Sequence, residues 1–228
     1  MPSKIFSAAV VGLDAQIVEV ETDVNYGLRS FNIVGLPDKA VEESKERVGA
    51  AIKSINLCPP HNQPLRVLVS LAPADLKKEG SLYDLPIALG FLLASKQTKF
   101  DPRERIFLGE LSLDGRLRPV KGVLPIALSI EEGMFSEIIL PKKNAFEAAL
   151  LSAKTADQDK KNIRVIGAEN LKEVIDHLEG RKQIAPFQIN IEELIEKPDF
   201  TMDLSLIKGQ EYAKRALEIT AAGGHNLL

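Results

Sequence analysis

The chain is poor in cysteine and in aromatic residues. Its 228 residues include one cysteine, Cys58, and no tryptophan, and aromatic residues make up 5% of the whole. A single cysteine excludes an internal disulfide and a metal site built from several cysteines. We interpret Cys58 as a small packing residue. The scarcity of aromatic side chains gives little support to base stacking as a main source of nucleic-acid affinity.

Long apolar runs and an excess of one charge are also missing. No apolar run approaches the roughly 20 residues of a membrane-spanning helix, and the first residues lack the regions of a signal peptide. The net charge is −3, from 29 basic and 32 acidic residues, so no overall field attracts nucleic acid or membrane. His61 and His177 lack metal-ligand spacing, and no metal site is expected. The sequence predicts a cytoplasmic protein without a membrane partner.

A strand, a polar loop and an apolar helix over residues 65–95 are the feature around which we interpret the rest. Leu65–Leu71 alternates as a strand does, and residues 73–80 form a polar loop. From Asp84 onward, apolar residues recur at intervals of three and four, which predicts a helix. Asp84 is interpreted as the N-cap of this helix rather than as an acid–base residue. Pro86 then falls in the first turn, where its missing N–H costs little.

Strand and helix signals alternate along the remaining chain. Residues 5–11 and 15–21 predict an antiparallel hairpin around Gly12. Asp38 is expected to cap a helix over 39–55, and Asp114-Gly115 predicts a second hairpin turn. The fold class is therefore α/β (α+β), with a mixed sheet and helices.

The composition changes near residue 180. We expect a domain over 1–180, a linker over 181–200 that contains Pro186 and Pro198, and a last segment over 201–228. About 28 residues with one helix cannot complete a domain, so the last segment is expected to be the start of a second one.

Several motifs together resemble the YifB/ComM family of magnesium-chelatase-like AAA+ ATPases. The motifs cover essentially the whole chain: Gly35-Leu36-Pro37-Asp38, then Glu42, Ser44, Arg47 and Val48, then LAPADLKKEG at 71–80, YDLPIALG at 83–90, GELSLDG at 109–115, RPVKG at 118–122, IKGQ at 207–210, AKRALE at 213–218 and AGGHNLL at 222–228.

The resemblance implies a fold and a role. The first 180 residues are similar to the N-terminal domain of that family, which is like the Lon protease proteolytic domain and the RadA C-terminal domain. The tail is similar to the truncated entry of the AAA+ module, where Ile207, Gly209 and Gln210 resemble the segment that contacts adenine. For the full-length protein, the resemblance implies ATP and magnesium as cofactors. It also implies a homo-hexamer that drives DNA branch migration in recombination and natural transformation.

This chain itself is not expected to be a catalyst. It contains no G-x-x-x-x-G-K-[ST] phosphate-binding loop, so it should not hydrolyse ATP. Alignment with the serine–lysine dyad of Lon places Leu82 at the serine position and Leu124 at the lysine position. Ser81 then stands one residue early, and Lys121 three residues early. The expectation is a retained scaffold without its chemistry, with a Ser-Lys peptidase using Ser81 and a magnesium-chelatase-type subunit as alternatives.

Five basic residues in two loops are candidates for contact with DNA: Lys77, Lys78, Arg116, Arg118 and Lys121. A ring of such domains would present these loops repeatedly to a nucleic-acid backbone. The same residues can equally be a scattered solvated surface. We favour a role in assembly, with DNA contact as a secondary possibility.

Overall fold

The computed structural model describes residues 2–130, 134–150, 163–189 and 203–227. The chain divides into two compact units, 1–189 and 190–228, and each is described by itself. Gly133, which was expected to end a helix, and the predicted loop at 155–161 lie outside the described residues.

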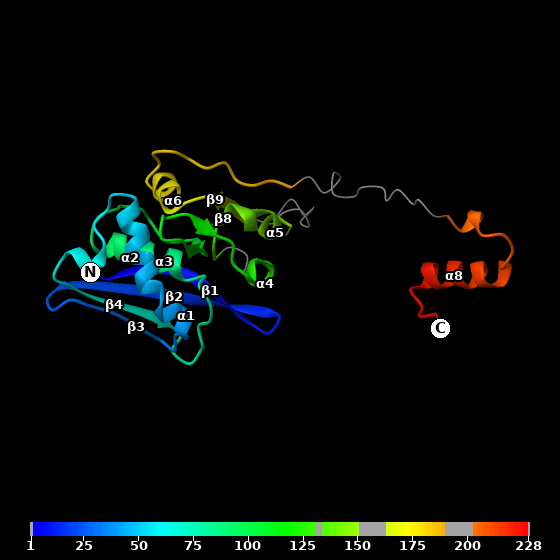
Figure 1. Cartoon of the computed structure of the whole chain (residues 1–228), viewed down its shortest axis with the longest axis horizontal. Helices are drawn as coiled ribbons and strands as arrows, with labels where there is room; N and C mark the ends of the chain where they lie inside the picture. Colours follow the sequence, from blue (N-terminus) through cyan, green and yellow to red (C-terminus); the bar gives the residue numbers. More distant parts are fainter. Residues whose placement is uncertain (1, 131–133, 151–162, 190–202, 228) are drawn as a thin grey trace. The chain divides into compact units, whose positions relative to one another are not determined.

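A seven-stranded mixed sheet forms the centre of the first unit (Figure 1). The strands are β1 (Ser3–Val11), β2 (Asp14–Tyr26), β3 (Ser30–Val34), β4 (Leu65–Ala72), β5 (Arg105–Phe107), β8 (Glu137–Pro141) and β9 (Arg164–Ala168), in the order β3-β4-β2-β1-β5-β8-β9. The pairs β1–β2 and β2–β4 are antiparallel, whereas the pairs of β3 with β4, β1 with β5, β5 with β8 and β8 with β9 are parallel. The α+β class with a mixed sheet is confirmed.

Both predicted hairpins are confirmed. Strands β1 and β2 pair from Ser3 opposite Thr22 to Val11 opposite Asp14. Two short strands, β6 (Glu110–Leu111) and β7 (Leu117–Arg118), form a separate hairpin. Its turn contains Gly115 at φ +81°, a conformation that glycine adopts without a steric penalty.

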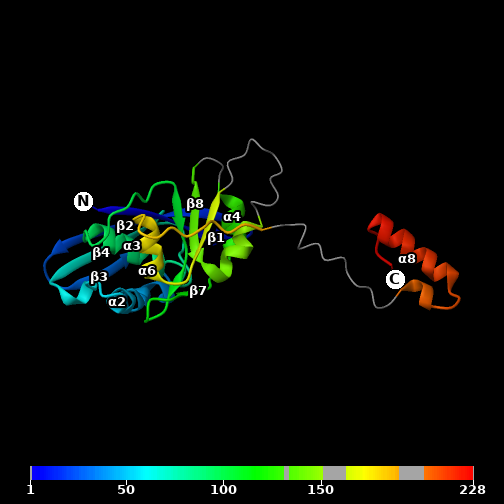
Figure 2. The same ribbon diagram turned by 90° about the horizontal axis from the view of Figure 1, so that it is seen from above.

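Helices pack on the sheet, as two perpendicular views show (Figures 1 and 2). They are α1 (Lys39–Glu42), α2 (Ser44–Ser54), α3 (Asp84–Ala94), α4 (Val123–Ser129), α5 (Ala145–Ala149) and α6 (Leu171–Leu178), with 3-10 turns at η1 (Pro60–Asn62) and η2 (Lys142–Asn144). The helix expected over 39–55 is thus divided at Glu43, although Asp38 caps its start as predicted, accepting from the Val41 N–H.

Helix α3 is buried on all sides, more deeply than an amphipathic pattern requires. Every residue from Asp84 to Leu92 is buried, because the helix lies between the sheet, α2 and β6. Gly90 allows its close approach to the sheet, since a Cβ there would lie 2.6 Å from Thr22 Oγ1. The Ser3 hydroxyl also donates to the Gly90 carbonyl at 2.7 Å.

Helix α4 covers the other face of β1. Successive side chains of a strand alternate between its two faces, so Val10 faces away from the side on which Ser3 meets α3. At Gly122, just before α4, a Cβ would lie 2.6 Å from Val10 Cγ2. The N-terminal strands are therefore covered by α3 on one face and by the start of α4 on the other.

The second unit contains η3 (Leu204–Leu206) and α8 (Glu211–Gly223). None of its described residues is buried, and the side chain of Tyr212 is 96% exposed. Across the described parts of both units, no helix is long and apolar enough to cross a membrane.

Candidate functional site

A cleft of about 630 Å³ lies at the start of helix α3. Three segments far apart in the sequence form its walls: the end of β1 at residues 9–11, the loop at residues 76–83, and residues 119–122 before α4, with Glu110 from β6. The cleft brings together Lys77 and Lys121, one from each of the two predicted basic loops. Ser81 lines the same cleft.

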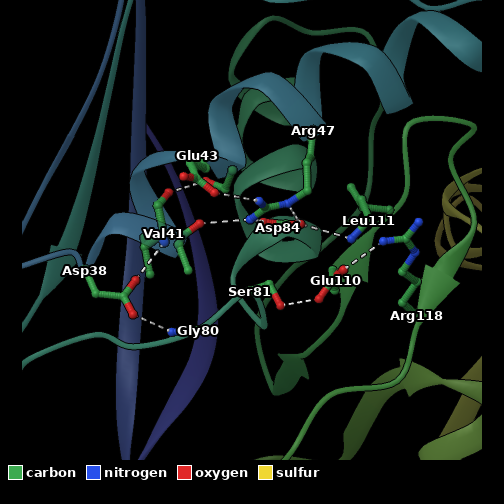
Figure 3. Close-up of polar contacts among 12 residues, drawn as sticks. Asp38, Val41, Glu43, Arg47, Gly80, Ser81, Asp84, Glu110, Leu111 and Arg118 are labelled. Carbon is green, nitrogen blue, oxygen red and sulfur yellow. Dashed lines mark hydrogen bonds and ion pairs between the residues drawn. The ribbon is translucent and has the colours of Figure 1, made fainter.

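The hydroxyl of Ser81 contacts a carboxylate. It donates a hydrogen bond to Glu110 Oε2, and Arg118 Nη1 reaches Glu110 Oε1 at 3.3 Å (Figure 3). Lys121 also lines the cleft but makes no hydrogen bond or ion pair within the described residues. Leu82, at the serine position of the dyad alignment, is buried. The partner of the Ser81 hydroxyl is therefore an acid that is itself paired with an arginine.

Asp84 is part of a buried ion pair and is not the N-cap. The N-cap is Tyr83, and Asp84 is the first residue of α3. Its carboxylate accepts from Arg47 Nε at 2.7 Å and Nη2 at 2.9 Å, and from the Leu111 N–H at 3.0 Å (Figure 3). The predicted cap is thus wrong, because the carboxylate binds groups on α2 and β6 instead of the first-turn amides.

The pair joins three elements around one buried charge. Asp84 is fully buried, whereas the Arg47 side chain is 20% exposed, and its Nη2 also donates to the Ala40 carbonyl at 2.9 Å. Burial raises the pKa of Asp84 to about 6, although the bonds from Arg47 and Leu111 act in the opposite direction. Desolvation thus outweighs the paired guanidinium in setting this pKa.

Asp38 connects two loops beside the cleft. One carboxylate oxygen accepts from the Val41 N–H at 2.8 Å, and the other accepts from the Gly80 N–H at 3.0 Å (Figure 3). The backbones of the same loops also pair, since the Asp38 N–H donates to the Lys78 carbonyl at 2.9 Å. The segment that enters α3 is therefore held by the segment that enters α1.

Lys78 is placed differently from the other predicted basic residues. Its side chain is buried, and its ammonium group donates to the Pro73 carbonyl. Burial lowers the pKa of this amine. In this conformation Lys78 stabilises its own loop and does not present a charge to a DNA backbone, contrary to what its position in a polar loop indicated.

A second hollow, of about 750 Å³, lies on the other side of Pro119, which lines both cavities. Its basic residues are Arg116, Arg118, Lys142 and Lys143. Carboxylates neutralise several of the surrounding cations: Asp114 lies 2.6 Å from Arg116, Glu169 2.6 Å from Lys142, and Glu79 2.6 Å from Lys77.

The roles of Arg47 and Glu110 were not predicted from the sequence. A signal for Arg47 exists, since it follows Ser44 by three residues and precedes Val48 and Ala51 on one side of α2. Those three neighbours are all buried. A charged residue on an apolar stripe requires a buried partner. Glu110 offers no comparable pattern, because its contacts depend on how the loops fold.

In the second unit, Ile207, Gly209 and Gln210 form the turn before α8. Gly209 has φ +73° and Gln210 has φ +58°, and all three are exposed. Their contact with adenine stays a prediction. Among the residues that the structure describes, no three histidine, cysteine, aspartate or glutamate side chains are grouped so as to hold a metal ion.

Comparison with known proteins gives matches along nearly the whole chain. Residues 20–144 match a family model described as subunit ChlI of Mg-chelatase, and residues 203–228 match one described as magnesium chelatase, subunit ChlI. The chain is 40% identical over 228 residues to the competence protein ComM of Haemophilus influenzae. This match covers 98% of the chain and 42% of the relative.

Two further relatives are uncharacterized proteins called YifB. The Escherichia coli protein is 37% identical over 238 residues, which covers 99% of this chain and 42% of the relative. The Salmonella typhimurium protein is 38% identical over 226 residues, covering 98% and 41%. The chain therefore spans about two fifths of the length of these relatives.

Proposed function

The chain belongs to the YifB/ComM family of magnesium-chelatase-like AAA+ proteins, and from this premise we propose that it serves as a non-catalytic domain for assembly and DNA contact. The proposal covers this chain of 228 residues, which spans 42% of ComM. The observation that carries it is the cleft at the start of α3, where the serine hydroxyl is bonded to Glu110.

The activity proposed for the whole protein rests on the family. We propose an ATP- and magnesium-dependent hexamer of the cytoplasm that drives DNA branch migration in recombination and natural transformation. The name of the Haemophilus influenzae relative, a competence protein, supports a link to DNA uptake. The likeness of the first unit to the Lon proteolytic domain belongs to the same proposal, and the mixed sheet is compatible with it.

The absence of catalysis follows from the chemistry of the cleft. A serine nucleophile needs a base that removes its proton and holds it during attack. Glu110 is engaged by Arg118 at 3.3 Å, and the aliphatic Leu82 occupies the aligned serine position. The Asp84–Arg47 pair beside the cleft lies between α2, α3 and β6. In our proposal these charges fix the platform and carry out no reaction.

DNA contact is proposed for the exposed basic residues between the two cavities. Lys121 has no polar partner among the described residues, and Arg118 is 60% exposed in its pair with Glu110. Exposed ion pairs are weak, so Arg118 can exchange its carboxylate for a phosphate. Lys77 and Arg116 are exposed in similar pairs, whereas the buried Lys78 is excluded from the contact set.

The DNA part is tested by fluorescence anisotropy with a labelled single-stranded oligonucleotide at several salt concentrations. The double variant Arg118→Ala/Lys121→Ala should bind more weakly and lose about 1.4 units of salt slope, at roughly 0.7 per phosphate contact. Arg103→Ala is the matched control, because Arg103 is an exposed, ion-paired arginine far from the cleft residues in sequence. An unchanged affinity and slope in the double variant would contradict DNA contact at these residues.

The assembly part is tested by sedimentation velocity over a range of chain concentrations. We expect species larger than the monomer as concentration rises, because the domain is proposed to pack against its neighbours in a ring. A monomer at every concentration, with and without DNA, would show that this part of the protein does not assemble the ring.

A peptidase remains the second candidate, because Ser81 and Lys121 line one cleft. It predicts peptide hydrolysis that is lost in both Ser81→Ala and Lys121→Ala. Such a result would replace the non-catalytic proposal. A magnesium-chelatase-type subunit is supported by the family descriptions, and it predicts a stable complex with chelatase partner subunits.

A further inference from the structure

A small polar hollow lies beside the edge strand β3. It has a volume of about 200 Å³ and shares no lining residue with the cleft or with the hollow beyond Pro119. Three segments meet there: residues 29–31 at the start of β3, the first turn of α2, and η1. Because these segments are distant in sequence, the hollow could not be found from a local motif.

Each segment places a basic side chain in the hollow. Arg29 comes immediately before β3, Lys45 lies in the first turn of α2, and His61 lies in η1. The imidazole is positioned by the absence of a side chain on α2: a Cβ at Gly49 would lie only 3.3 Å from His61 Cδ2. The buried Leu65 lines the same hollow.

The cations here differ from those around the cleft in their partners. Among the described residues, neither Arg29 nor Lys45 makes an ion pair or a side-chain hydrogen bond. The basic residues Lys77, Arg116, Arg118 and Lys142 are all paired with carboxylates. One carboxylate, Glu46, also lines the hollow, so two permanent positive charges face one negative charge.

We propose that this hollow binds a phosphate group of single-stranded DNA. The guanidinium of Arg29 offers a planar set of donors that matches phosphate, and Lys45 adds a compact charge. Ser30 adds a hydroxyl donor to the lining, and the half-buried Phe31 adds an aromatic ring on which a neighbouring base can stack. The inference rests on the proposed DNA contact and adds to it a second contact region.

Unpaired cations favour this hollow over the cleft as a first contact. A phosphate that binds here displaces no protein carboxylate from Arg29 or Lys45, whereas one that binds Arg116 or Arg118 must first replace Asp114 or Glu110. Counterion release from the nucleic acid then contributes to affinity without a compensating loss within the protein.

The experiment is an amide NMR titration of the 228-residue chain at constant ionic strength. Three probes are added separately: inorganic phosphate, deoxythymidine monophosphate and a short oligodeoxythymidine. We expect saturable shifts at residues 29–31, 44–46 and 61 with the oligonucleotide. The double variant Arg29→Ala/Lys45→Ala should weaken oligonucleotide binding at least tenfold. Lys53→Ala, which removes an exposed lysine from the same helix, should leave it unchanged.

The outcomes separate this inference from the proposed function. If only Arg118→Ala/Lys121→Ala weakens oligonucleotide binding, the proposed DNA contact stands and this inference is overturned. If only Arg29→Ala/Lys45→Ala weakens it, the inference stands and the cleft contact is wrong. Saturable shifts with the mononucleotide or inorganic phosphate, but not with the oligonucleotide, would overturn DNA as the source of the phosphate. Thermal unfolding followed by circular dichroism confirms that each variant is folded.

Discussion

Removing Arg47 should destabilise the first unit through the charge that it leaves behind. In Arg47→Met the carboxylate of Asp84 stays fully buried but loses both guanidinium hydrogen bonds, at 2.7 and 2.9 Å. Among the bonds that hold this carboxylate, only the one from the Leu111 N–H remains. Breaking a buried pair from one side typically costs about 3–5 kcal/mol, a large part of the stability of a domain.

The loss should depend on pH in a defined direction. Burial raises the pKa of Asp84 from 3.8 to about 6 in the folded chain. Between these values the folded state binds more protons than the unfolded state, so wild-type stability falls as the pH rises. Removing Arg47 raises the folded pKa further, because its bonds lower it. The cost of Arg47→Met should therefore be small near pH 5 and reach about 3–5 kcal/mol near pH 8.

The assay is urea unfolding followed by circular dichroism at pH 5 and pH 8. Arg47→Met/Asp84→Asn is the second variant, because an amide removes the buried charge and its oxygen can still accept from Leu111. Replacing both partners should cost much less than breaking the pair from one side. Arg103→Met provides the matched control, since Arg103 is 82% exposed in its pair with Asp101, and little change is expected there.

Two results would refute the reasoning. One is a cost below about 1 kcal/mol for Arg47→Met at pH 8, the size expected for an exposed pair. The other is a double variant that is as unstable as Arg47→Met, because the loss would then come from the packing of the arginine stem and not from an uncompensated charge.

Three further perturbations test other contacts. Asp38→Ala removes the cap of α1 and the acceptor of the Gly80 N–H, and should lower the free energy of unfolding by about 1–2 kcal/mol in urea melts. Gly35→Ala should prevent recovery of soluble folded protein, because its Cβ would lie 2.1 Å from a main-chain carbonyl oxygen at φ +104°, whereas Gly12→Ala, with open space around it, should be tolerated with a modest fall in melting temperature. His177→Phe removes the Nδ1 acceptor of the Ile184 N–H and should speed hydrogen exchange of that amide; unchanged exchange would show that the contact does not hold residues 181–189.

Local chemistry was predictable where a contact is made within a few residues. Asp38 accepts from Val41, three residues later, and Asn170 caps α6 by accepting from the Glu173 N–H. The hairpin at 114–115 follows from the turn preference of Asp-Gly. Each of these predictions needed only the spacing between a turn residue and the element beside it.

Longer-range choices could not be predicted in this way. Asp84 has the residue type and position of an N-cap, but its carboxylate binds Arg47, 37 residues earlier. Lys78 and Lys77 are adjacent in one polar loop, but the first is buried and the second is exposed. Which of the two turns inward depends on the pairing of the loop with residues 36–38, which no local pattern contains. The hollow at Arg29 likewise depends on the order of strands in the sheet.

The unequal lengths of two neighbouring strands explain why a cavity exists at the start of α3. Strand β1 has nine residues, whereas its parallel neighbour β5 has three, and the two are in register only where Phe6 lies opposite Ile106. Past that point the chain after β5 turns toward α3, and the last residues of β1 border open space. Any side chain placed on residues 9–11 therefore faces solvent-filled volume on one flank, so this wall can change in sequence without disturbing the layers beneath it.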